Sequence, residues 1–297
     1  MEKTTEEQVL KSRSARSCIS AGYRLYIGNF KRIFRATWLT ALLAAVMSGV
    51  ASSVLSGQVT LTPTMLVVAV ATLMLGLVAN VVLGAQLFGL LAKHREEVII
   101  PVTSRWFSVD KRMLVRTLVW TVFAFIISLL GGILIGTVVG LGIAHQSLVM
   151  LGSCVLLALV LALLEFPLIH PAIHYLTTQE KGFFKITRRG YGEGMRHYGL
   201  LFVVMLVVTL LTMVVLMLTT LPAIILATAN MRAQAGVAMG DPLGMPSYMS
   251  TMTIAVMSIA AFIQSYLMLS IFFPAYYASG SIETQEQERN EKKNSLY

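Results

Sequence analysis

Residues Leu114 to Ile143 read LVRTLVWTVFAFIISLLGGILIGTVVGLGI, an apolar stretch in which Arg116 is the only charged residue. About 20 apolar residues in a helix cross the hydrocarbon core of a bilayer, so this stretch predicts a transmembrane helix. Five further stretches have the same character, and we expect an all-α integral membrane protein. The six predicted spans are Ala36 to Gly57, Thr64 to Ala92, Leu114 to Ile143, Ser147 to Thr177, Tyr198 to Asn230 and Ser247 to Ser279.

The composition of the chain agrees with this class. Hydrophobic residues make up 56% of the 297 residues and charged residues 12%, whereas a soluble domain carries about a quarter charged residues. The net charge of +9 therefore has to be placed relative to a membrane rather than read as a nucleic-acid footprint. With only two cysteines, we expect neither a disulfide framework nor a cysteine metal site, and we expect no cofactor.

The positive charges alternate between the predicted connections. Lys and Arg residues number eight in residues 1–35, six in 93–116, five in 181–196 and three in the C-terminal tail, which leaves Arg232 on the other side. The positive-inside rule then places both termini in the cytoplasm. We expect a multi-pass protein of the cell inner membrane.

The chain also repeats with a period of about 80 residues. Each predicted unit is a basic, aromatic lead segment followed by a helical hairpin, and the three leads are YRLYIGNFKRIFR (23–35), SRWFSVDKRMLVR (104–116) and KGFFKITRRGYGEGMRH (181–197). We predict a polar N-terminal tail at 1–17 and a six-helix membrane domain at 18–282. Its repeats are about 18–95, 101–180 and 181–282, and residues 283–297 are predicted to form a charged, disordered tail.

The lead segments are predicted to lie at the membrane interface. On a helical projection the aromatic residues of the first lead gather on one side, which would dip into the acyl boundary, while the basic residues meet anionic headgroups. Three alternatives stay open: ordinary anchors, docking of a phospholipid or lipid-linked substrate, and docking of a membrane protein partner. Gly190, Gly192 and Gly194 argue against an unbroken helix in the third lead. The headgroup candidates are Arg24, Lys31, Arg32, Arg35, Lys111, Arg112, Arg188 and Arg189.

Glu165 is the only acidic residue inside a predicted span, and His170 and His174 follow it at helical spacing. An ionisable residue at membrane depth indicates function, so this segment is a candidate site. An ideal helix places Glu165 far around from the two histidines, although Pro167 and Pro171 can bend it. Structural pairing with a neighbouring helix, proton or substrate handling, and a metal site stay open for this group.

Polar amides occur in the other even-numbered spans, at Asn80, Gln86 and Gln264. Together with Glu165 they would line a central cavity. Alternatively, they hold the hairpins together by hydrogen bonds between helices.

Small residues recur at every fourth position in two spans. Gly132, Gly136 and Gly140 form one such series, and Gly49, Ser53 and Gly57 form the other. This spacing lets two helix backbones approach closely, so we expect helix packing within the bundle or in a homo-oligomer.

The segment AGYRLYIGNFKRIFRATW entering six spans resembles a broad group of bacterial membrane proteins that includes the membrane domain attached to some glycerophosphodiester phosphodiesterases. The resemblance implies a module acting near phospholipids, as an accessory subunit or scaffold, and carries over no catalytic residue. Our first hypothesis is a non-enzymatic, lipid-associated or scaffolding membrane module. The alternative is a small transporter with a polar cavity around Glu165. A membrane-embedded enzyme would need Glu165, His170 and His174 to converge.

Overall fold

A computed structural model describes residues 9–55, 62–97, 109–146, 148–240, 246 and 248–295. Over these residues the chain is helical, and six helices are long and apolar enough to cross a membrane, as predicted. The elements are α1 (Ala15–Gly28), α2 (Phe30–Leu55), α3 (Pro63–Glu97), α4 (Lys111–Ala144), α5 (Leu148–Glu165), the 3-10 turn η1 (Phe166–Leu168), α6 (Ile169–Thr177), α7 (Phe183–Arg196), α8 (Tyr198–Ala238) and α9 (Met249–Asn294).

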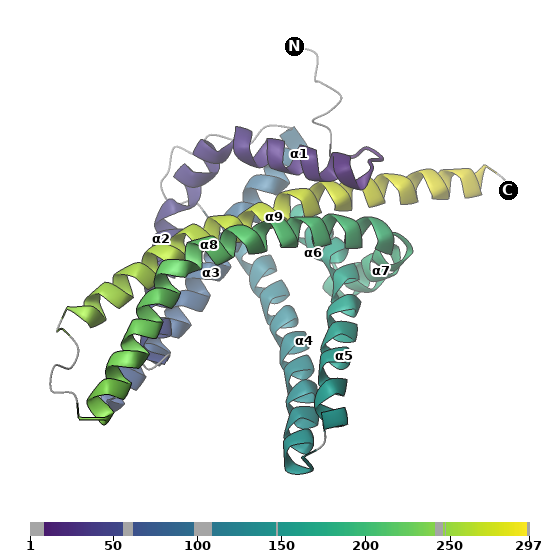
Figure 1. The fold of residues 1–297 in the computed structure, drawn as a ribbon. Coiled ribbons are helices and arrows are strands. Elements are labelled where there is room, and N and C mark those ends of the chain that lie inside the picture. Colours follow the sequence, from purple (N-terminus) through teal and green to yellow (C-terminus); the bar gives the residue numbers. More distant parts are fainter. Residues whose placement is uncertain are drawn as a thin grey trace.

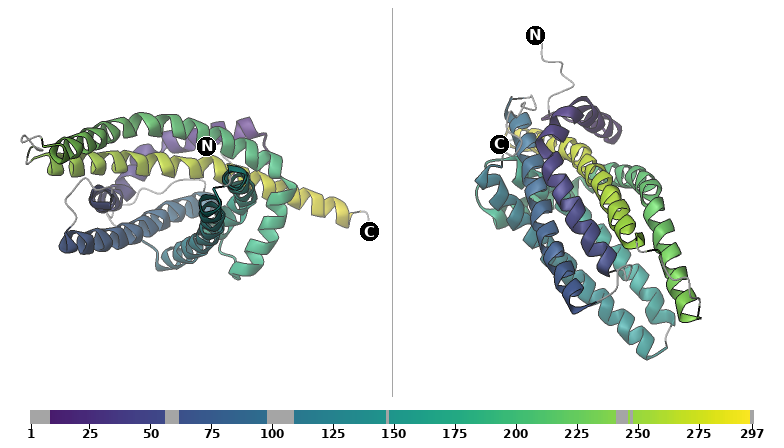
Figure 2. Two further views of the ribbon diagram at one scale, coloured as in Figure 1. Left: turned by 60° about the horizontal axis from the view of Figure 1, so that its bottom comes forward. Right: turned by 90° about the vertical axis from the view of Figure 1, so that its left-hand side faces the viewer.

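The helices form two arms that diverge from one end of the molecule (Figures 1 and 2). The four-helix arm contains α2, α3, the C-terminal part of α8 and the N-terminal part of α9, with α2 packed between α3 and α9. The hairpin arm consists of α4 and α5. The arms meet at a junction formed by α6, α7 and the C-terminal part of α9, and α1 lies across α9 at this end.

Prolines end the long helix of the hairpin arm where it enters the junction. Pro167 has no N–H to donate to the carbonyl of Leu163, and the hydroxyl of Tyr198 donates to that oxygen instead at 3.2 Å. The hydroxyl of Tyr191 donates to the next carbonyl, that of Leu164, at 3.4 Å. The irregularity expected from the prolines is confirmed, and it separates α5 from α6.

The first lead segment differs from the single interfacial helix that we predicted. Asn29 interrupts it between α1 and α2, and its side chain caps α1 by donating to the carbonyl of Leu25 at 3.1 Å. The aromatic side does not simply face lipid, because Tyr26 is buried against Phe273 of α9 and its hydroxyl donates to the carbonyl of Tyr266 at 3.0 Å. Aromatic packing on α9 therefore replaces much of the predicted lipid contact.

The third lead segment also differs from the prediction, because α7 runs unbroken through its three glycines. A Cβ atom at Gly190 would lie 2.8 Å from the Cβ of Pro171, and one at Gly194 would lie 2.6 Å from the carbonyl oxygen of Pro167. These two glycines let α7 approach the proline-containing segment closely. The tertiary contact thus offsets the poor helix propensity of glycine.

The C-terminal residues were predicted to be a disordered tail, and this prediction is wrong for those described. Helix α9 continues to Asn294. The Glu, Gln, Lys and Arg residues of this segment favour helix, and two carboxylates within it are buried in ion pairs. Glu283 pairs with Arg95 and His174, and Glu286 pairs with Arg196 and His197.

The two series of small residues behave differently. Gly49 and Ser53 lie in the packed face of α2, where a Cβ atom at Gly49 would lie 2.8 Å from the backbone nitrogen of Ser258 in α9. A Cβ atom at Gly132, Gly136 or Gly140 would meet nothing within 4 Å in the described chain. Packing within the bundle is therefore the wrong interpretation for the α4 series, and a homo-oligomer contact there stays a prediction.

Several parts of the predicted organisation lie outside the described residues. They are residues 1–8 of the N-terminal tail, Gly57, the start of the second lead at 104–108, the first residues of two predicted spans (Ser147 and Ser247), and residues 296–297. The threefold repeat stays a prediction. Consecutive spans pack in pairs, α2 with α3, α4 with α5 and α8 with α9. The pair formed by α4 and α5 is separate from the other two pairs, which pack together (Figure 2).

Candidate functional site

Two cavities lie between the arms, close to the junction. The larger has a volume of about 470 Å³ and the smaller about 220 Å³. Trp120, Ala172 and Phe272 line both of them. We call the two cavities together the interarm chamber. Trp120 lies about 14 Å along the α4 axis from Lys111.

The larger cavity has apolar walls with a few neutral polar groups. Asn80 and Gln264 line it, in agreement with one of the two alternatives that the sequence left open. The Asn80 amide donates to the carbonyl of Gly76 at 2.8 Å, and the Gln264 amide donates to the hydroxyl of Thr220 at 3.4 Å. Thr117 also lines the cavity and is buried, and its hydroxyl has no hydrogen-bond partner among the described residues.

Gln86 does not belong to this lining. Its side chain is only 5% exposed, and neither amide atom has a partner within the part of the chain that the structure describes. Of the three amides predicted to share a cavity, the structure thus brings together two. The helical register explains the difference, because Leu83 and Gly84 occupy the side of α3 that faces the chamber.

The smaller cavity contains Glu165. This residue ends α5 and is exposed, with Trp120, Phe123 and Phe272 among the other lining residues. Ser128 lines the same cavity, about 25 Å along α4 from its start at Lys111. The carboxylate therefore lies well inside the apolar length of the hairpin arm. It makes no ion pair with any described residue, so the predicted pairing with a neighbouring helix is not observed.

The two histidines lie in the junction instead. His170 is fully buried, and its ring nitrogens lie 2.9 Å from the hydroxyl of Ser279 and 3.2 Å from a carboxylate oxygen of Glu193. The Nδ1 atom of His174 lies 2.8 Å from a carboxylate oxygen of Glu283. The histidines thus face α7 and α9, whereas Glu165 faces the chamber. The three groups do not converge as an embedded enzyme would need.

The electrostatics of the junction follow from this pairing. Burial raises the pKa of the Glu193 carboxyl, but its hydrogen bond with His170 and the charges of His170 and Arg189 outweigh burial. The pKa of Glu193 therefore lies below its ordinary value. Arg189, a headgroup candidate, instead approaches His174, Glu180 and Glu193. Its charge serves the junction rather than a lipid surface.

Several junction residues were missed by sequence reasoning. Arg95 forms an ion pair with Glu283, and Arg116 donates to the carbonyls of Thr178 and Glu180. The Arg116 guanidinium also lies 4.5 Å from the ring centre of Tyr175. An arginine inside the first turns of an apolar span was the available signal for Arg116. Glu283 carried no such signal, because its partners come from α3 and α6, far away in the sequence.

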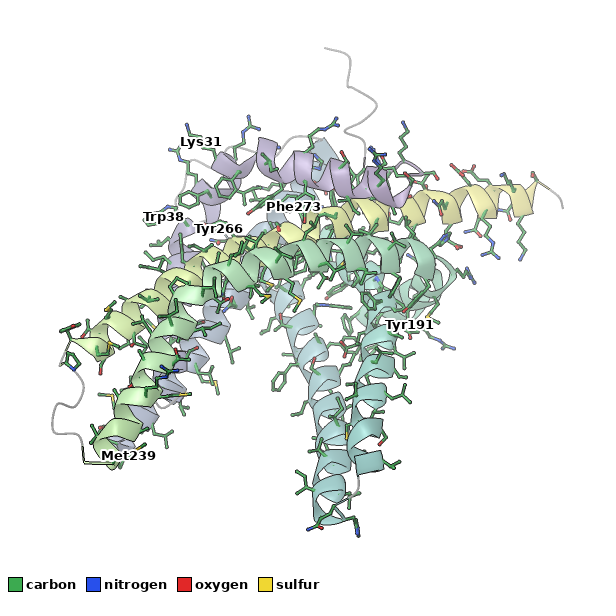
Figure 3. All side chains as sticks on the ribbon, viewed as in Figure 1. Lys31, Trp38, Tyr191, Met239, Tyr266 and Phe273 are labelled. Carbon is green, nitrogen blue, oxygen red and sulfur yellow. The ribbon has the colours of Figure 1, made fainter. Side chains whose placement is uncertain are left out.

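The other basic candidates lie at the junction end of the molecule. Lys31 points away from the arms (Figure 3), and Arg24, Arg35, Lys111 and Arg188 are exposed. Two candidates also make hydrogen bonds: Arg32 with Asn29 at 3.3 Å, and Arg112 with Gln179 at 3.1 Å.

Comparison with protein-family models, curated proteins and solved structures finds no match for this chain. The resemblance to phosphodiesterase membrane domains therefore stays an expectation. Among the described residues, no group of three or more His, Cys, Asp or Glu side chains is arranged to hold a metal ion.

Proposed function

We propose that this protein is a non-enzymatic, lipid-associated membrane module that holds a lipid or lipid-like molecule in the interarm chamber. The observation that carries the proposal is the chamber itself, two adjoining cavities of about 470 and 220 Å³ with aromatic and aliphatic walls. Cavities of a few hundred cubic ångströms with a small number of polar groups are typical ligand sites. The placement of Asn80 and Gln264 in the lining fits an occupant that is mostly apolar and carries a polar group.

The arrangement of charge supports a membrane setting with a defined orientation. The described residues of the leads carry most of the positive charge and lie near the junction, whereas Arg232 lies near the far end of α8. We propose that the junction faces the cytoplasm in the cell inner membrane, with both termini on that side. The exposed basic residues of this end would then contact anionic lipid headgroups.

The test is to fill the chamber and measure retained lipid. Ala172→Trp places an indole where both cavities meet, and we expect the purified protein to lose its most tightly retained lipid in quantitative mass spectrometry. Ala162→Trp is the matched control, because Ala162 lies on the exposed surface of α5, outside the chamber lining.

Thr121→Trp is a second variant in case Ala172→Trp does not fold. It places an indole in the larger cavity from α4. Equal lipid retention in wild type and in all three variants would show that the chamber holds no lipid.

A second candidate function is transport, and Glu165 favours it. A carboxylate without a described partner, inside an apolar arm and facing a cavity, fits a group that takes up a proton or a cationic substrate. Reconstituted vesicles containing a pH-sensitive dye would report proton flux. Transport predicts that Glu165→Gln abolishes this flux while the protein remains folded. Absence of proton flux in the wild-type protein would rule out proton transport, and lipid holding would then be the one function that we propose.

A further inference from the structure

Helix α1 has one packed face and one open face. Cys18, Gly22 and Tyr26 are buried on the packed face, and Gly22 lies against Phe273 and Pro274 of α9. The opposite face forms the wall of a groove with a volume of about 940 Å³. Residues 11–14 and Tyr277 of α9 complete the groove, which is separate from the interarm chamber.

The chemistry of the groove is that of an anion site. Among the described residues, the lining contains no carboxylate and includes four basic side chains and four serine hydroxyl groups. Arginine presents several N–H donors in a planar fork that matches phosphate oxygens, and hydroxyls supply further donors. The basic residues are Lys11, Arg13, Arg16 and Arg24, and the hydroxyls belong to Ser12, Ser14, Ser17 and Ser20.

Contacts with α9 hold the N-terminal side of the groove in place. The backbone N–H of Arg13 donates to the hydroxyl of Ser281 at 2.9 Å, and the Gln285 amide donates to the hydroxyl of Ser12 at 3.2 Å. The Arg13 guanidinium lies 5.3 Å from the ring centre of Tyr277. The segment before α1 is therefore fixed relative to α1, and the basic groups face one space before any ligand arrives.

The position of the groove allows two sources of ligand. Helix α1 lies at the end of the molecule opposite the tips of the arms (Figure 1). An anionic phospholipid would reach it with its headgroup, and a soluble phosphate compound would reach it from the aqueous side. Both sources present the same phosphate oxygens to the arginines.

We propose that the α1 groove binds a phosphate-bearing anion through Lys11, Arg13, Arg16 and Arg24, assisted by the serine hydroxyls. This site is independent of lipid binding in the interarm chamber. Lys11 and Arg16 are exposed and form no ion pair with a described residue, so neutralising them leaves the observed fold contacts intact.

The experiment measures binding of inorganic pyrophosphate to the detergent-solubilised full chain by calorimetry. In a second arm, the protein is placed in nanodiscs of phosphatidylcholine with and without phosphatidylglycerol, and lipid enrichment is measured by mass spectrometry. We expect saturable binding in at least one arm. Binding of pyrophosphate identifies a soluble phosphate, and enrichment of phosphatidylglycerol alone identifies a headgroup.

The variant Lys11→Gln/Arg16→Gln should weaken the observed binding at least tenfold, and Ser17→Ala/Ser20→Ala should weaken it by a smaller factor. The control Lys292→Gln/Lys293→Gln removes the same charge from the C-terminal end of α9, at exposed residues that lie outside the groove and are not headgroup candidates, and should change affinity less than twofold. Absence of saturable binding in both arms, or equal losses in groove and control variants, would overturn the proposal.

Discussion

Both arms of the molecule are built from apolar helices, but these helices differ in how far they are packed against the rest of the protein. In the most apolar stretch of α2, 39% of the residues are buried inside the protein, whereas in that of α4 none is. Hydropathy is higher in α4 than in α2. In a bilayer, lipid tails are as apolar as leucine, so apolarity places a helix in the membrane without deciding what it packs against. The less apolar helix, α2, is the more packed of the two, so packing does not follow hydrophobicity in this molecule.

We expect the largest difference between the two arms from a matched pair of leucine substitutions. Leu87 in the four-helix arm is fully buried, whereas Leu130 in the hairpin arm is 61% exposed. We expect Leu87→Ala to lower the free energy of unfolding by about 2–5 kcal/mol, because it leaves a cavity. Leu130→Ala should change it by less than about 0.5 kcal/mol. Reversible unfolding in detergent micelles measures both, and equal losses would show that the hairpin arm is packed in solution.

The attachment of the hairpin arm depends on Arg116. Because its guanidinium binds two backbone carbonyls after α6, we expect Arg116→Gln to cost about 1.5–3 kcal/mol. Spin labels at Leu66→Cys and Ile143→Cys, exposed on the two arms, should show a broader distance distribution in this variant. The native cysteines at 18 and 154 are buried, which favours labelling of the introduced sites. An unchanged distribution would mean that Arg116 does not set the angle between the arms.

Substituting alanine for glycine should have opposite effects on stability in α2 and in α4. Gly49→Ala brings a Cβ atom against the backbone of Ser258, and overpacking of this kind costs about 1–3 kcal/mol. Gly136→Ala meets nothing in the described chain and should be neutral or stabilise by up to about 1 kcal/mol, through helix propensity. Thermal unfolding of the two variants measures the difference. Destabilisation by Gly136→Ala that depends on protein concentration would instead place a second copy of the chain on α4.

The smallest effect is expected at the junction, as a dependence of stability on pH. The folded-state pKa of Glu193 lies below its ordinary value of 4.5. The ionised carboxylate therefore contributes fully to the free energy of unfolding above pH 4.5, and this contribution is lost as the pH falls through the folded-state pKa. We expect wild type to lose more stability than His170→Gln as the pH is lowered from 5 to 3. If the free energy of unfolding changes with pH in the same way in both proteins, the pair of His170 and Glu193 does not contribute to stability.

The sequence was informative where a local pattern determines a local structure. The six spans and the irregularity at Pro167 were predicted and confirmed, because burial of apolar residues in lipid and the missing proline N–H act on neighbouring residues. The same local reasoning was wrong for α7 and for the end of α9. Gly190 and Gly194 are helical because two prolines pack on them, and Glu283 is ordered because Arg95 and His174 bind it.

The candidate site divides in the same way. The sequence by itself determined which residues are costly in a membrane, and it therefore selected Glu165, His170, His174, Asn80, Gln86 and Gln264. Only the tertiary structure decided that the histidines pair with carboxylates at the junction while Glu165 faces the interarm chamber. The physical reason is that the energetic cost of a polar group in lipid depends on the residue itself, whereas the partner that offsets this cost is supplied by whichever helix the fold brings next to it.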